Sequence, residues 1–184
     1  MRNFLIALLI SLSTQAVANN DIANHKLVEA VEAINANVIF MRHALAPGYG
    51  DPEYFNVADC STQRNLNDMG RTQAKSIGTA VLNSGLEFEE ILSSQWCRCT
   101  QTTELLNLGR WSTFGGLNSF FQGHTNKQAS LDLLHKKLAS LGRGLTLMVT
   151  HQVVISAITN HVVASGDLVA YNSTTLAAQA LTLE

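Results

Sequence analysis

The chain reads Asn37-Val38-Ile39-Phe40-Met41-Arg42-His43 at the point that decides its fold. The apolar run over residues 37–41 predicts a short buried strand. An arginine and a histidine directly after such a strand stand at the edge where open α/β sheets bind their ligands. The stretch therefore predicts a buried strand with a functional site at its carboxyl end.

Two later stretches repeat this arrangement. Ile91-Leu92 precedes Ser93-Ser94-Gln95-Trp96-Cys97-Arg98, and the apolar run 145–149 precedes Thr150-His151-Gln152. Because the strand ends meet at one rim of the sheet, we expect four side chains to gather there: Arg42, His43, Arg98 and His151. Guanidinium groups bind two phosphoryl oxygens at once, and a neutral imidazole can attack phosphorus. The pattern predicts a phosphate site with its own nucleophile.

The rest of the sequence alternates between helical and strand patterns. Helices are predicted over 68–83, 100–108, a leucine stripe ending near 141, and 153–163; closing strands are predicted over 168–171 and 176–183. This alternation is typical of an α/β fold with a largely parallel sheet. The stretch 44–65 between the first strand and first helix has no such pattern. We expect it to form a substrate-facing flap, because long irregular loops are usually functional or disordered.

The first 18 residues have the features of a secretory signal peptide. Arg2 is followed by an apolar run over 4–12 and by Ala16-Val17-Ala18, a pattern typical of a cleavage site. We predict cleavage after Ala18, export to the periplasm or the extracellular space, and a single domain over 19–184. The apolar run is shorter than the ~20 residues of a membrane span, so no stable membrane insertion is expected. A net charge of −2 disfavours nucleic acid as a partner.

The chain has three cysteines, Cys60, Cys97 and Cys99. Export to an oxidising compartment favours one disulfide, and Cys97 and Cys99 are too close in sequence to bridge each other easily. We therefore expect Cys60 to pair with either of them. Zinc ligand spacing is absent. The spacing from Cys60 to Arg64 is C-x3-R, which excludes the C-x5-R site of protein tyrosine phosphatases.

These motifs resemble those of the histidine phosphatase superfamily, in its phosphoglycerate-mutase-like branch. The resemblance rests, in the family's order, on Met41-Arg42-His43, on Asn65-Leu66 with Gly70-Arg71-Thr72-Gln73-Ala74, on Ser93-Ser94 through Thr102, and on Val149-Thr150-His151-Gln152. It implies a three-layer sandwich with helices on both faces of the sheet. It also implies a phosphohistidine mechanism without metal or cofactor, in which His43 is the nucleophile and Arg42, Arg98 and His151 bind the phosphoryl group.

The chain departs from the family pattern at two positions. Ala44 stands where the family has glycine, and Asn118 stands near the position of the family's proton-donating glutamate. An amide cannot donate a proton to a leaving alkoxide. Asp51, Glu53 and Asp59 in the long loop are possible substitutes, although each is more simply interpreted as a solvated loop acid. We expect His124, His135 and His161 to be structural or exposed, and Trp96 and Trp111 to be packing residues.

The sequence thus predicts an exported, metal-independent phosphatase that hydrolyses phosphomonoesters through a phosphohistidine. Its partner would be a small phosphorylated substrate, with an envelope-linked sugar phosphate as one analogy. The missing acid leaves open a catalytically weak or inactive anion-binding protein on the same fold. A phosphorelay phosphatase or a mutase is disfavoured, since their partners lie inside the cell and a mutase needs a large cap.

Overall fold

Six strands form one open sheet in the order β3-β2-β4-β1-β5-β6 in the computed structural model, which describes residues 25–183. The strands are β1 Val38–Arg42, β2 Phe88–Ser93, β3 Ser112–Thr113, β4 Leu145–Thr150, β5 Leu168–Tyr171 and β6 Ala178–Leu181. The pairs β3-β2, β2-β4 and β4-β1 are parallel. The pairs β1-β5 and β5-β6 are antiparallel. The largely parallel sheet predicted from the sequence is confirmed, with an antiparallel pair at one edge.

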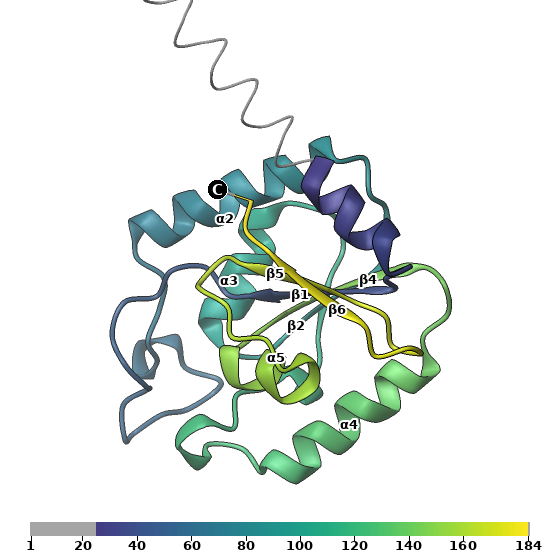
Figure 1. The fold of residues 1–184 in the computed structure, drawn as a ribbon. Helices are drawn as coiled ribbons and strands as arrows, with labels where there is room; N and C mark the ends of the chain where they lie inside the picture. The colour runs from purple at the N-terminus through teal and green to yellow at the C-terminus, as the bar shows by residue number, and fades with distance from the viewer. Residues whose placement is uncertain (1–24, 184) are drawn as a thin grey trace, which may run out of the picture.

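Helices cover both faces of this sheet (Figure 1). They are α2 Asp68–Asn83, α3 Cys97–Leu106, α4 Lys127–Ser140 and α5 Gln152–Thr159, and residues 25–33 are also helical. Successive strand residues point to opposite faces. Ile39 and Met41 of β1 accordingly pack with α2 and α3, while Val38 and Phe40 pack with α4 and α5. The result is the predicted three-layer sandwich, with β1 buried on both sides.

Several predicted boundaries differ from those observed. α2 spans the residues predicted for it, but α3 begins at Cys97 rather than 100, so Arg98 lies in its first turn. α5 ends at Thr159 rather than 163, because Asn160 adopts a left-handed conformation with φ of 59° and ends the helix. β6 is likewise shorter than predicted, since Leu176 also has a positive φ.

The loop between β1 and α2 is held at both of its ends. At the α2 end, the Asn67 side chain caps the helix by accepting a hydrogen bond from Gly70 N at 2.8 Å. A Cβ atom at Gly70 would lie 2.0 Å from the Leu45 carbonyl oxygen, so only glycine permits this close approach of α2 to the loop. The start of the loop is therefore packed against the first turn of α2.

A disulfide joins Cys60 in this loop to Cys97 at the start of α3, and Cys99 remains a buried free thiol. This confirms the predicted disulfide and decides between its two possible partners. Because Cys97 immediately precedes Arg98, the bridge fixes the loop beside the arginine that the sequence assigned to phosphate binding.

Within residues 25–183, no helix is long and apolar enough to cross a membrane. The predicted signal peptide and its cleavage site lie outside the described residues.

Candidate active site

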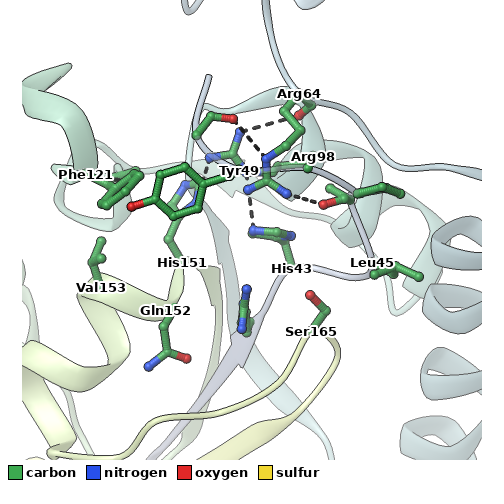
Figure 2. A pocket seen from close by; sticks show the side chains of 16 residues that line it. His43, Leu45, Tyr49, Arg64, Arg98, Phe121, His151, Gln152, Val153 and Ser165 are labelled. Carbon is green, nitrogen blue, oxygen red and sulfur yellow. Dashed lines mark hydrogen bonds between the residues drawn. The ribbon is translucent and has the colours of Figure 1, made fainter. Parts of the chain in front are cut away.

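The carboxyl ends of β1, β4 and β2 bring the predicted site together. His43 follows β1 and His151 follows β4, and the two imidazole rings lie 5.4 Å apart, centre to centre. The backbone N–H of His43 donates to Thr150 O, which ties the two strand ends to each other. Arg98 reaches both rings from the first turn of α3, the helix that follows β2 (Figure 2). All four predicted residues, including Arg42 at the end of β1, line one cavity.

His43 is buried and its two ring nitrogens have different environments. Nδ1 lies 2.8 Å from the carbonyl oxygen of Ala44, so Nδ1 carries the proton and donates it. Nε2 then has a free lone pair, to which Arg98 Nε donates across 3.2 Å. Burial, followed by the charge of Arg98, holds the pKa of His43 well below its ordinary value of 6.5. Burial is therefore the larger cause of its neutrality, and the charge of Arg98 adds to it.

His151 is also buried and neutral. Ser94 Oγ donates to Asn118 Oδ1 at 3.1 Å, so it accepts from the Nε2–H of His151 at 2.9 Å. Nδ1 of His151 consequently faces Arg98 Nη2, 3.4 Å away, as an acceptor. Burial and Arg98 again lower the pKa of this histidine well below its ordinary value.

Arg98 is anchored by a carboxylate that the sequence did not place there. Its Nη1 and Nη2 donate to Oδ1 and Oδ2 of Asp51 at 2.8 and 3.1 Å, a bidentate pair with both side chains only 4% exposed. The end of the guanidinium is thus occupied by Asp51. Its remaining edge, formed by Nε and Nη2, faces His43 and His151.

Asp51 accepts two more hydrogen bonds, from Arg64 N at 3.0 Å and from Trp96 Nε1 at 3.1 Å. Burial raises the pKa of Asp51, but the hydrogen bonds from Arg98 and Arg64 outweigh burial and leave the pKa below its ordinary value. Every contact of this carboxylate stabilises its ionised form. Asp51 therefore serves as an acceptor that orients Arg98.

A third guanidinium, that of Arg64, lines the same cavity and was missed by the sequence reasoning. Arg64 is held by the loop itself, because it donates to the carbonyl oxygens of Gly50 and Ala46. The one available signal was its position two residues before Leu66, at the start of the α2 motif. Arg42 donates through Nη1 to Val163 O at 2.7 Å, while its buried Nε has no partner among the described residues.

The cavity has a volume of about 390 Å³, and its lining divides into two parts. The basic and imidazole side chains form its floor. The apolar and aromatic lining residues, which we call the rim, are Leu45, Ala46, Pro47, Tyr49, Phe121 and Val153; the remaining lining residues are Gly48, Gly50, Ser119, Gln152 and Ser165. Six of the lining residues come from 45–50, which confirms that the loop after β1 faces the site.

None of the suggested proton donors lines this cavity. Asp51 lies behind Arg98, while Glu53 and Asp59 are exposed. Asn118 is buried and used structurally, since its Oδ1 also accepts from Gln95 N at 2.9 Å. His124, His135 and His161 do not line the cavity either. Trp96 is a buried packing residue, as predicted, that also binds Asp51.

Among residues 25–183, no group of three or more His, Cys, Asp or Glu side chains is placed to hold a metal ion. Cys99 lies 3.4 Å from His151 Nε2, but burial raises the pKa of its thiol to about 12. It is therefore a neutral packing residue rather than a thiolate.

Solved structures with a similar fold come from the class that the sequence motifs suggested. The protein histidine phosphatase SixA complexed with tungstate is 15% identical, with a TM-score of 0.52 over 79% of this chain and 94% of that chain. A phosphoglycerate mutase from Thermus thermophilus is 14% identical, with a TM-score of 0.56 over 80% and 99% of the two chains. No family model matches the sequence, and no curated protein is significantly similar to it.

These likenesses establish a phosphoglycerate-mutase-like fold. The fold that the sequence motifs implied is thus confirmed.

Proposed function

We propose that the chain is an exported phosphatase that hydrolyses phosphomonoesters through a phosphohistidine on His43, without a metal. One observation carries the proposal: the unprotonated Nε2 of His43 faces a cavity lined by three guanidinium groups. Such a cavity binds a phosphoryl group, and the nucleophile is already in place. The fold shared with a protein histidine phosphatase supports the same conclusion.

The ligand-free contacts indicate where the phosphoryl group would bind. Arg98 now donates to the nitrogen lone pairs of His43 and His151, which face its free edge. A phosphoryl group between the two rings would offer anionic oxygens, which are stronger acceptors. Arg98 would therefore donate to the phosphoryl oxygens through this edge while it remains bound to Asp51, and the His43 lone pair would become free for attack.

Arg42 and Arg64 would bind the remaining phosphoryl oxygens. Arg42 has a buried Nε–H with no partner among the described residues, and a bound anion would satisfy this donor. Phosphoryl transfer depends mainly on positioning and on stabilising charge at the equatorial oxygens, and both tasks fall to these guanidiniums.

His151 would bind the phosphoryl group as a donor once its proton moves to Nδ1. The Ser94 hydroxyl permits this change, because it can rotate from Asn118 and donate to Nε2 instead. In the first step, the bond from His43 Nε2 to phosphorus forms and the bond to the leaving oxygen breaks. Water then cleaves the phosphorus–nitrogen bond, which returns neutral His43 and inorganic phosphate.

The test is rapid quench with a labelled phosphomonoester, followed by acid and base treatment of the protein. We expect a label on the wild-type protein that is stable in base and labile in acid, and no turnover in His43→Ala. Arg98→Ala should lower the rate by about 10²–10³, by analogy with loss of an oxyanion donor. EDTA should change none of these results. Full activity in His43→Ala would end this mechanism.

A second candidate is a phosphate-binding protein without catalysis, because no carboxylic acid lines the cavity among the described residues. It predicts that inorganic phosphate binds the wild type and His43→Ala with similar affinity, and that no substrate is turned over. Calorimetric titration beside the quench experiment separates the two candidates.

A further inference from the structure

The rim of the cavity carries an aromatic pair that the chemistry at its floor does not use. The rings of Tyr49 and Phe121 lie 5.2 Å apart in an edge-to-face arrangement, and both residues line the cavity. In Figure 2 they lie beside each other near Arg98 and His151. Tyr49 is 87% exposed, although it belongs to a loop that is otherwise hydrogen-bonded and disulfide-bridged.

An exposed ring at the mouth of a ligand cavity offers apolar surface to whatever enters. Aromatic rings gain most from another ring, placed edge-on or offset against them. Leu45, Pro47 and Val153 extend the apolar surface around the pair. A phosphoryl group on the cationic floor would therefore place its leaving group against an apolar wall with two aromatic rings.

The proton donors present at the site set a second, independent limit on which leaving groups can depart. No Asp or Glu lines the cavity in the described part of the chain. The Nδ1–H of His43 is bound to the Ala44 carbonyl, and the N–H of neutral His151, whether at Nε2 or at Nδ1, is a far weaker acid than a carboxyl group. With no buried acid to protonate it, the leaving oxygen must depart as an anion. Phenolates do so far more readily than alkoxides, since phenols ionise with a pKa near 10.

We infer that the site acts on aryl phosphomonoesters, with the leaving ring seated against Tyr49 and Phe121. This inference rests on the proposed phosphatase function and names its substrate class. The bond from His43 Nε2 to phosphorus forms, the bond from phosphorus to the aryl oxygen breaks, and the phenolate leaves with the electron pair. Sugar phosphates, whose alkoxides need a proton, are the poorer substrates.

The experiment must separate contact with the ring from the acidity of the leaving group. Phenyl phosphate is therefore compared with a fluoroalkyl phosphate whose alcohol has a similar pKa, and with glycerol phosphate. For the wild type we expect kcat/KM for phenyl phosphate to exceed that for the matched fluoroalkyl ester by about 10-fold, the scale of one aromatic contact. Glycerol phosphate should be the slowest of the three.

Substitutions at Tyr49 test whether this rim residue causes the preference for phenyl phosphate over the fluoroalkyl ester. Tyr49→Ala should raise KM for phenyl phosphate by about 5- to 10-fold and leave the fluoroalkyl ester within about 2-fold of wild type. Tyr49→Phe keeps the ring and should keep the preference, so a loss in this variant would assign the effect to the hydroxyl and overturn the inference. Tyr54→Ala is the matched control, because Tyr54 is an exposed aromatic residue of the same loop that does not line the cavity.

Two outcomes contradict the substrate class while leaving the phosphatase intact: equal kcat/KM for the two matched esters, or an equal loss on both in Tyr49→Ala. If no ester is hydrolysed at all, the proposed function fails, and binding still tests the subsite. Phenylphosphonate should then bind about 10-fold more tightly than methylphosphonate in calorimetry, and equal affinities would refute the aromatic subsite.

Discussion

Asp51→Asn tests the arrangement around Arg98 most directly, because it removes one charge and changes little else. Oδ1 and Oδ2 of Asp51 accept hydrogen bonds from Arg98 Nη1 and Nη2, from Arg64 N and from Trp96 Nε1. An asparagine side chain has one acceptor oxygen, so its NH₂ group would face donors. The variant would also leave the Arg98 charge buried without its counter-charge.

The size of the effect follows from this burial. Removing one partner of a buried ion pair costs about 3–5 kcal/mol, and the acceptor that asparagine retains places this case near the lower end. We expect the free energy of unfolding, measured by urea denaturation, to fall by about 3 kcal/mol. Asp59→Asn is the matched control, since Asp59 is an exposed acid of the same loop whose side chain binds only Ser61 among the described residues. Asparagine caps as well as aspartate there, so the urea midpoint of Asp59→Asn should match that of the wild type.

The kinetics of Asp51→Asn distinguish an orienting carboxylate from a proton donor. If Asp51 orients Arg98, the variant should lower kcat/KM for phenyl phosphate and for glycerol phosphate by the same factor. A proton donor would matter for glycerol phosphate alone, because a phenolate leaves without help. An Asp51→Asn protein as stable as Asp59→Asn, or one impaired only on the alkyl ester, would refute the reasoning.

Three further results are expected. Replacing both Cys60 and Cys97 by serine should lower the free energy of unfolding by about 3–4 kcal/mol, the loop-entropy value for a separation of 37 residues, whereas equal urea midpoints would contradict this. The pKa values of His43 and His151 are lowered in the folded protein, so below pH 6.5 only the unfolded chain takes up protons at these two residues. The free energy of unfolding should therefore fall between pH 6.5 and 5 by up to about 2.7 kcal/mol per pH unit. A free energy of unfolding that does not change over this pH range would contradict the prediction. N-terminal sequencing of exported protein should begin at Asn19, and retention of Met1 would exclude cleavage.

The sequence predicted the strand ends well because their placement follows from a rule of the fold. A buried strand that ends in polar residues fixes where those residues lie: Arg42 ends β1, His43 follows it, and His151 follows β4. The helix 68–83 was also predicted with its bounds, since Asn67 is a good cap and the apolar period is clear. Shorter elements such as β3, with two residues, carry no period that could be detected.

The partners of Arg98 could not be predicted in the same way. The loop that contains Asp51 and Arg64 has no period, and a contact across 47 residues depends on how the whole loop packs. Asp51 therefore appeared equivalent to Glu53 and Asp59 as a loop acid. The one clue to the location of Asp51 was the predicted disulfide of Cys60, because this bridge places the loop against the segment that contains Arg98.

The same loop supplies what distinguishes this site from the general pattern of its fold. The strand ends provide Arg42, His43 and His151, which are the proposed nucleophile and two of the proposed phosphate ligands. The loop adds Asp51 behind Arg98, Arg64 on the floor and Tyr49 on the rim, and it adds no acid to the cavity. A proton-donating acid is needed only when the leaving group is basic, such as an alkoxide. The loop places no such acid in the cavity, but it does place the Tyr49 ring there, and this ring suits aryl leaving groups, which need no proton. Selectivity should therefore change with substitutions in residues 44–66, while the phosphohistidine step should depend on the strand ends.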